Sequence, residues 1–291
     1  MGIALKNLNT SRHNYVLSTK IFFGCFADEN NTIHNSHSTN RKHIIEGVER
    51  SLKNLDHDYI DVLFLHRYDD ETPTQEVCEA MRDLISQGKI LYWATSTWPS
   101  IRIMEAIHIC DKIGAPRPIA DQCIYNMLKR SFVEKEYTVL FDDYGYGTTT
   151  WSPLQMGLLT GKYNNGIPEG SRFEKLTHIS SPIMKEYFGE GKKEKTLEML
   201  NKLELIAKRF DASISQLALA WCLGSKDVST CIFGSSRLSQ LEDNMKAVVL
   251  KSKITKETWD EIEDVLKILN TRPEPEDNFR AGMGKKLPLR R

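Results

Sequence analysis

The chain alternates short apolar runs with longer amphipathic segments, and this alternation recurs along most of its length. The clearest apolar run is Ile60–Leu65, which leads directly into His66. A short continuous run of this kind, bounded by polar residues, is typical of a buried strand. Further strands are predicted on the same grounds at residues 15–19, 90–95, 118–121, 148–150 and 230–233.

The amphipathic segments predict helices. After the first strand, Ile44, Val48, Leu52 and Leu55 recur at the three- and four-residue spacing of one helix face. Similar segments predict helices at about 74–87, from 99, at 132–141, 192–209 and 213–223, after 237, and at 256–269.

His66 stands where a buried strand ends and a helix is about to begin. Thr72, Pro73 and Gln75 predict an N-cap, a proline at the first helical position and a capping box for that helix. Lys20 likewise ends its own strand. In α/β folds the ligand lies at the carboxyl ends of the strands. We therefore expect both side chains at the site.

Six strand-then-helix repeats of similar spacing predict parallel strands and an α/β fold of the (β/α)8 barrel, or TIM-barrel, type. No clear linker interrupts them. One domain is therefore expected over residues 1–270, followed by a basic tail at 271–291, and the Asn-rich stretch at 29–40 is expected to be a solvated loop.

Composition narrows the classes of function. The chain has 291 residues, 40% of them hydrophobic, which is enough for a large core. Thirty-nine basic residues balance thirty-nine acidic ones, so no nucleic acid is expected as a partner. No apolar run approaches the ~18–20 residues of a membrane span, and no signal peptide is expected. The cysteines form no C-x-x-C pair, and we expect reduced thiols in a cytoplasmic protein, without a disulfide frame or metal site, at residues 25, 78, 110, 123, 222 and 231.

Seven short motifs follow one another along the chain: Ser18–Gly24, Arg41–Gly47, Gly88–Ser96, Thr150–Leu154, Gly161–Tyr163, Gly166–Pro168 and Gly234–Arg237. Together they resemble the aldo-keto reductases, most closely the branch that contains the voltage-gated potassium channel beta subunits. The resemblance extends over roughly residues 1–270. It implies a TIM-barrel fold and carbonyl reduction by NADPH without a metal ion.

The resemblance also implies roles for individual residues. In this family a tyrosine donates the proton, a lysine lowers its pKa, an aspartate holds the lysine, and a histidine orients the carbonyl. Lys20 matches the lysine and His66 the histidine. Ser96 and Gln122 match residues that hold the nicotinamide amide.

Other matches concern the rest of the cofactor. The pyrophosphate segment matches Trp151, Ser152, Pro153, Leu154, Gly157 and Lys162, and Arg172 matches an arginine over the cofactor. The adenosine and 2′-phosphate end matches Gly234, Ser236, Arg237, Gln240, Asp243 and Asn244. Backbone N–H groups at a helix start, with a guanidinium beside them, suit a phosphate.

The chain departs from the family in one important respect. No segment resembles the Asp-Thr-Ala-x-x-Tyr-Gly stretch that carries the catalytic tyrosine and aspartate, and Tyr15 and Tyr68 do not have the family's placement. Two β/α units, on the order of 60 residues at ~30 per unit, are therefore expected to be missing. Thr97 replaces an arginine that is common after the Thr-Ser pair. We expect reductase activity to be impaired or lost.

Two classes of function stay open. One is a vestigial NADPH-dependent oxidoreductase that binds nucleotide through the half of the site that survives, with NADPH expected to bind weakly or not at all. The other is a non-catalytic subunit of an ion channel or larger assembly. Six strands would leave two open sheet edges, which favour association. That arrangement fits a truncated gene model or splice form, a sheet closed by a protein partner or a second copy, or an open barrel within an assembly.

Overall fold

The computed structural model describes residues 1–8, 10–23, 37–175 and 177–273, and the side chains of 172 and 177–181 also lie outside this description. The chain forms two compact units, residues 1–123 with 139–151, and residues 124–138 with 152–291. Most of the predicted Asn-rich loop and of the predicted tail at 271–291 lies outside the described residues. One domain over residues 1–270 stays a prediction.

Strands in chain order build the sheet of the first unit: β1 (Ser18–Ile21), β2 (Ile60–Leu65), β3 (Ile90–Thr95), β4 (Ala120–Ile124) and β5 (Gly147–Trp151). The pairs β1–β2, β2–β3 and β3–β4 are parallel. Parallel neighbours need a long crossover between them, and helices provide it: α2 (Arg41–Leu55), α3 (Thr74–Ser86) and α4 (Ser100–Ile113). With β6 (Thr230–Cys231) of the second unit, the described residues hold six strands alternating with helices. This confirms the predicted α/β class and is consistent with an incomplete (β/α)8 barrel.

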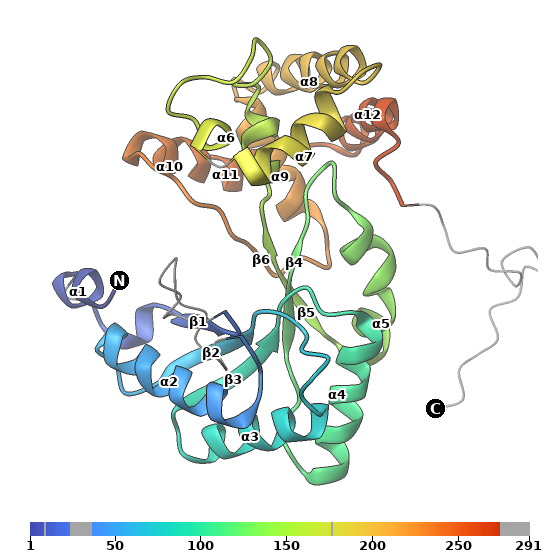
Figure 1. The fold of residues 1–291 in the computed structure, drawn as a ribbon. Coiled ribbons are helices and arrows are strands. Elements are labelled where there is room, and N and C mark those ends of the chain that lie inside the picture. The colour runs from blue at the N-terminus through green and yellow to red at the C-terminus, as the bar shows by residue number, and fades with distance from the viewer. Residues whose placement is uncertain (9, 24–36, 176, 274–291) are drawn as a thin grey trace, which may run out of the picture. The chain divides into compact units, whose positions relative to one another are not determined.

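Helices α2, α3 and α4 lie side by side along the sheet of the first unit (Figure 1). Two of the residues that predicted α2, Ile44 and Val48, are fully buried, and Val77, Met81 and Leu84 of α3 are buried with them. The apolar stripe of each helix therefore packs inward, as the spacing predicts. The short helices α1 (Gly2–Asn7) and α5 (Thr138–Tyr144), with a 3-10 turn at Arg12–Asn14, complete this part of the chain.

The start of α3 differs from the predicted capping box. Pro73 precedes the first helical residue, and no side chain caps the helix. The Thr72 hydroxyl instead donates to Asp69 Oδ2 at 2.7 Å, and Gln75 bonds to Glu79 one turn further along the helix. The Thr72 hydroxyl therefore donates its proton to a nearby carboxylate, and its oxygen accepts from no main-chain N–H at the start of α3.

Several element boundaries also differ from the predictions. β1 begins at Ser18 rather than Tyr15, because the Leu17 N–H donates to the Asp61 carboxylate at 2.6 Å instead of joining the ladder. The predicted helix at 132–141 consists of a π-helical turn, Phe132–Glu136, and the separate helix α5. β6 is limited to two residues, so the Gly234–Arg237 segment does not follow its strand directly.

The second unit is helical. Its members are 3-10 turns at Gln155–Thr160 and Lys267–Leu269 and the helices α6 (Arg172–Lys175), α7 (Thr177–Phe188), α8 (Lys193–Lys208), α9 (Ile214–Gly224), α10 (Leu238–Met245), α11 (Ala247–Lys251) and α12 (Lys256–Leu266). Helix α9 is buried on almost every side, with residues 216–222 all inside. A helix that is apolar all round belongs at the centre of a core. A capping box that the sequence analysis missed, Ser213 with Gln216, starts it.

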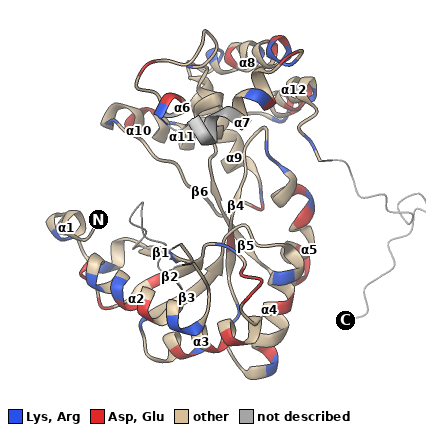
Figure 2. Ribbon diagram, in the orientation of Figure 1, with Lys and Arg blue, Asp and Glu red and all other residues tan. Residues whose placement is uncertain are grey.

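Charged side chains of both signs are interspersed along the helices of each unit. Figure 2 shows blue and red segments mixed on α2 and α3 and, in the second unit, on α8. Several form ion pairs one turn apart, such as Lys42–Glu46 and Lys202–Glu198. Among the described residues, no helix combines the length and the apolar character needed to cross a membrane.

Candidate functional site

Parallel pairing places four predicted site residues on one face of the first unit's sheet. Lys20 pairs with Phe64, and Phe64 pairs with Ala94. Paired side chains share a face, and so do side chains two apart along a strand. His66 and Ser96, two residues beyond Phe64 and Ala94, therefore belong to this face, one step nearer the carboxyl ends of the strands.

Gln122 completes this row. Thr95 pairs with Asp121, so Ser96 lies opposite Gln122, and the Ser96 hydroxyl donates to the Gln122 main-chain oxygen at 2.9 Å. Both side chains are buried. Gln122 lies inside β4, although the sequence had placed it after the strand. The first unit thus places Lys20, His66, Ser96 and Gln122 on one face of its sheet.

Lys20 lies within β1, one residue before its end, rather than after it. Its Nζ is 5.8 Å from the centre of the Phe64 ring. Burial lowers the pKa of Lys20, and the nearby Arg67 guanidinium lowers it further. No carboxylate among the described residues forms an ion pair with this ammonium.

His66 follows β2 directly, as predicted, and its N–H donates to the Ile21 oxygen at 2.9 Å. The edge of its ring meets Phe23 at a centroid distance of 5.0 Å. Burial first, and then the charges of Arg67 and Lys20, lower the pKa of His66 to about 4. The imidazole is therefore neutral at pH 7. A neutral imidazole has one N–H donor, which is the group needed to orient a carbonyl oxygen.

Sequence reasoning missed Asp121, the buried carboxylate beneath Ser96. Asp121 Oδ2 accepts from the Thr95 hydroxyl at 2.7 Å, and Oδ1 accepts from the Thr97 N–H at 2.9 Å; the Trp98 N–H also donates to it. Thr97 has a φ of +57°, which is uncommon for a residue other than glycine. The carboxylate holds this turn and with it the position of Ser96. A lone acidic residue within an apolar strand was the available signal.

Trp151 ends β5, and its indole Nε1–H donates to the Thr97 hydroxyl at 3.4 Å. The threonine that replaces the family's arginine therefore contacts a predicted cofactor residue of its own unit. Arg67 was also missed, although it follows His66 directly and lowers the pKa of both His66 and Lys20.

In the second unit, the predicted pyrophosphate segment has an unusual backbone. Ser152, Gln155, Met156 and Gly157 all have positive φ, and Pro153 and Leu154 lie in the turn between them. A Cβ on Gly157 would lie 2.7 Å from Cε and 2.9 Å from Nζ of Lys162. Gly157 has a φ of +100°, which other residues rarely adopt, and Lys162 packs closely over this turn; the role of both residues in cofactor binding stays a prediction.

The predicted adenosine end lies around the start of α10. The Ser236 N–H and hydroxyl both donate to Gln240 Oε1, at 3.1 and 3.2 Å, and Arg237 is the N-cap residue without a side-chain cap. Asp243 instead accepts from Gln216 Nε2 at 2.7 Å, which ties it to the start of α9.

Three further predicted site residues lie in the second unit. Asn244 is buried on α10. Gly234 has open space where a Cβ would lie, so packing does not require glycine there. Arg172 begins α6, and its side chain is outside the described residues. Lys20, His66, Ser96, Gln122 and Trp151 belong to the first unit, and the other predicted site residues belong to the second.

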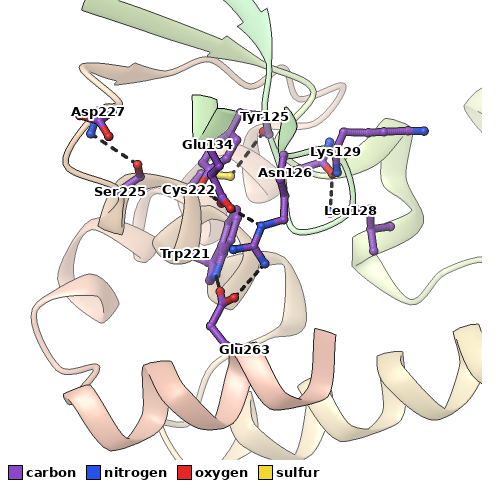
Figure 3. A network of polar contacts seen from close by, with 11 residues as sticks. Tyr125, Asn126, Leu128, Lys129, Glu134, Trp221, Cys222, Ser225, Asp227 and Glu263 are labelled. Atoms are coloured by element: carbon purple, nitrogen blue, oxygen red, sulfur yellow. Dashed lines mark hydrogen bonds and ion pairs between the residues drawn. The ribbon is translucent and has the colours of Figure 1, made fainter. Parts of the chain in front are cut away.

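A second buried charge organises the second unit. Arg130 Nε donates to Glu134 Oε1 at 2.8 Å, and its Nη1 lies 2.9 Å from Glu263 Oε2 (Figure 3). Its guanidinium also lies 4.9 Å from the centre of the Trp221 ring, which stacks on Tyr125. This network joins the segment after β4 to α9 and α12, and no sequence motif predicted it.

Comparison with known proteins identifies the family. The model of the Aldo/keto reductase family matches residues 1–267. The parallel strands and intervening helices agree with that match. The chain therefore belongs to the aldo/keto reductase family, as its motifs indicated.

Individual relatives narrow the similarity within this family. The chain is 44% identical over 266 residues to a Schizosaccharomyces pombe (strain 972 / ATCC 24843) protein named "Putative voltage-gated potassium channel subunit beta", covering 91% of this chain and 75% of that protein. It is 40% identical over 275 residues to an Arabidopsis thaliana protein named "Probable voltage-gated potassium channel subunit beta", covering 94% of this chain and 80% of the relative. A similarly named protein of Oryza sativa subsp. japonica is 38% identical over 281 residues, which is 96% of this chain and 81% of that protein.

Proposed function

We propose that this chain is a cytoplasmic, NADP(H)-linked member of the aldo/keto reductase family of the potassium channel beta subunit type, with feeble or no carbonyl reductase activity of its own. The row formed by Lys20, His66, Ser96 and Gln122 carries this proposal. These residues lie at the carboxyl ends of parallel strands, where ligands of such folds bind.

The cofactor would supply a hydride to a carbonyl carbon. In the first unit, Ser96 and Gln122 would hold its amide end. For the second unit we propose separately that Gly157, Lys162, Ser236 and Arg237 bind phosphate. The Gly157 turn supports this assignment, because the missing Cβ leaves room for Lys162 to lie over the backbone. His66, neutral at pH 7, would donate its N–H to the carbonyl oxygen, and Lys20 would favour negative charge developing there.

The weak step is proton donation. Both tyrosines nearest in sequence to the two catalytic candidates are engaged elsewhere. The Tyr15 hydroxyl bonds to His57 Nε2 at 2.6 Å, before the first residue of β1. The Tyr68 ring meets Trp98 edge-on at 5.1 Å, and the Arg102 guanidinium lies over it. Neither is placed as an acid beside Lys20, so we expect the 291-residue polypeptide to reduce aldehydes at no useful rate.

Two measurements on this polypeptide test the proposal. Nicotinamide fluorescence during titration should show weak NADPH binding or none, and NADPH consumption with 4-nitrobenzaldehyde should not exceed the rate without protein. Lys20→Met and the exposed control Lys112→Met should leave that background unchanged. Clear turnover that Lys20→Met abolishes and Lys112→Met preserves would contradict the proposed loss of activity.

A non-catalytic role as an associated subunit is the second candidate. The names of the relatives favour it, and so does an apolar stripe on the second unit formed by Leu238, Leu241, Met245, Val248 and Val249 of α10 and α11, each 42–69% exposed. Contiguous exposed apolar side chains are typical of interaction surfaces. We propose that a second copy or a channel protein covers this stripe.

Sedimentation of the purified chain tests the second candidate. Self-association is expected, and the double variant Leu241→Glu and Val248→Glu should shift the chain towards a monomer. Leu205→Glu is the matched control, because Leu205 is a similarly exposed residue of α8 in the same unit. A monodisperse wild-type monomer that also fails to bind the cytoplasmic part of a voltage-gated potassium channel would exclude this role.

A further inference from the structure

Two cysteine thiols meet inside the second unit. Cys222 lies near the end of α9 and Cys231 lies in β6, and these two elements pack against each other. The Cys222 thiol donates to the Tyr125 main-chain oxygen at 3.6 Å, as Figure 3 shows. Cys222 is also hydrogen-bonded to the Cys231 side chain.

The two thiols differ in their access to solvent. Cys222 is fully buried, whereas Cys231 is only partly buried. Of the two, Cys231 is therefore the thiol more accessible to a small oxidant, and its hydrogen-bonded neighbour is the buried one. Burial raises the pKa of Cys222, and its hydrogen bond with Cys231 raises that pKa further, so Cys222 is the thiol that reacts second.

The first unit contains a natural comparison. Cys78 of α3 and Cys110 of α4 are also hydrogen-bonded to each other, and Cys78 donates to the Ala106 oxygen at 3.7 Å. Both of these side chains are fully buried. This second pair has the same chemistry and lacks the exposed sulfur, so it separates the effect of thiol proximity from the effect of access.

We propose that Cys231 and Cys222 form a redox site that a hydroperoxide converts to an intramolecular disulfide. The Cys231 thiolate attacks one peroxide oxygen, an S–O bond forms, the O–O bond breaks, and the leaving oxygen takes up the released proton. The Cys222 thiolate then attacks the Cys231 sulfur, the S–O bond breaks, and hydroxide leaves as water with the Cys222 proton. Two thiols lose two electrons in total, and hydrogen peroxide becomes two waters.

The test is a cysteine map of the folded wild-type protein after exposure to hydrogen peroxide. Catalase stops the reaction, free thiols are alkylated under denaturing conditions, and peptides covering all six cysteines are identified by mass. We expect one cross-linked species, Cys222 with Cys231, lighter by two hydrogens and restored by dithiothreitol. Cys78 and Cys110 should be fully alkylated. Peroxide added after unfolding in guanidinium chloride should remove this selectivity.

Two variants resolve the order of the steps. In Cys222→Ser, dimedone should trap a sulfenic acid on Cys231, and in Cys231→Ser, Cys222 should stay reduced. The proposal is overturned if Cys222 and Cys231 of the folded wild type stay alkylatable under conditions that oxidise free cysteine, or if Cys78 and Cys110 cross-link at the same rate. The wild-type map decides these points even if a variant fails to fold.

Discussion

In the part of the chain that the structure describes, each unit contains one buried charged side chain, and the two are satisfied in different ways. Asp121 in the first unit accepts from the Thr95 hydroxyl and from the main-chain N–H groups of Thr97 and Trp98, all within one turn. Arg130 in the second unit instead meets two carboxylates, Glu134 and Glu263, that lie on different elements.

The difference shows what each charge does. A carboxylate surrounded by backbone donors fixes a local conformation, here the turn with positive φ that positions Ser96. A guanidinium that presents several donors in a planar fork can join elements distant in the chain. Asp121 therefore shapes the site, while Arg130 holds the second unit's helices together around Trp221.

The largest effect is expected from Asp121→Ala. Two buried donors and one partly buried donor would lose their acceptor, and the expected loss of unfolding free energy is about 3–4 kcal/mol. Denaturant unfolding followed by circular dichroism measures it. Asp121→Asn, which keeps one acceptor oxygen, should cost less. Faster hydrogen exchange at the Thr97 and Trp98 amides would locate the change. Unaltered exchange there would argue against the proposal that Asp121 holds this turn.

Arg130→Ala should have the next largest effect. It leaves two acidic side chains without their cation, and because both are partly exposed the expected cost is about 2–3 kcal/mol. Arg130→Lys is the matched control, since it keeps the positive charge and loses the planar guanidinium with its several donors. It should retain part of that stability. Equal unfolding midpoints for Ala, Lys and wild type would contradict the role given to this network.

His66 should make the stability of the first unit depend on pH. Its folded pKa, about 4, is below the ordinary value of 6.5, so between these values the unfolded chain binds a proton that the folded chain does not. Stability should therefore fall as pH decreases from about 7 to about 4. His66 should contribute about 1–2 kcal/mol to this fall, because solvent screens part of the effect at its half-buried ring.

Denaturant unfolding of wild type and His66→Asn across this range isolates the contribution, because other titrating groups, His43 among them, are common to both. The variant should show the shallower pH dependence. Parallel curves for the two proteins would show that His66 is not held neutral by its surroundings.

The smallest effect concerns the helix caps. Helix α9 has a complete capping box and α3 has no side-chain cap, so Ser213→Ala should destabilise the second unit by about 1 kcal/mol. Ser213→Thr keeps the hydroxyl and should be close to neutral. In the first unit, Thr72→Ala would remove hydrogen bonds to Asp69 and Ser38 but no helix cap, and unfolding midpoints would show whether the two sites differ as expected.

Much of the fold followed from local pattern. The run Ile60–Leu65 became β2, and the spacing of Ile44 and Val48 identified the buried face of α2. His66 was correctly placed after its strand, because a buried strand that ends in a polar residue is visible in one short segment. The motifs also predicted the family correctly, over residues 1–267.

Competing hydrogen bonds limited these predictions. Thr72 has the sequence of an N-cap, yet its hydroxyl bonds to Asp69. Tyr15 is a residue type common in strands, yet its hydroxyl bonds to His57 and the strand begins only at Ser18. His57 is 42 residues from Tyr15 and is brought there by tertiary folding, so the local sequence could not reveal that bond; Asp69, by contrast, is only three residues before Thr72.

The sequence alone determined the alternation of strands and helices, the family, and the residue types available for chemistry. Only the tertiary structure decided that Lys20, His66, Ser96 and Gln122 share one face of the sheet. It also decided that Asp121 supports the turn at Thr97, and that Cys222 meets Cys231. The physical reason is the distance along the chain over which each kind of interaction acts. Periodicity and turn preferences act over a few neighbouring residues, whereas register, burial and the pairing of buried polar groups depend on segments far apart in the chain.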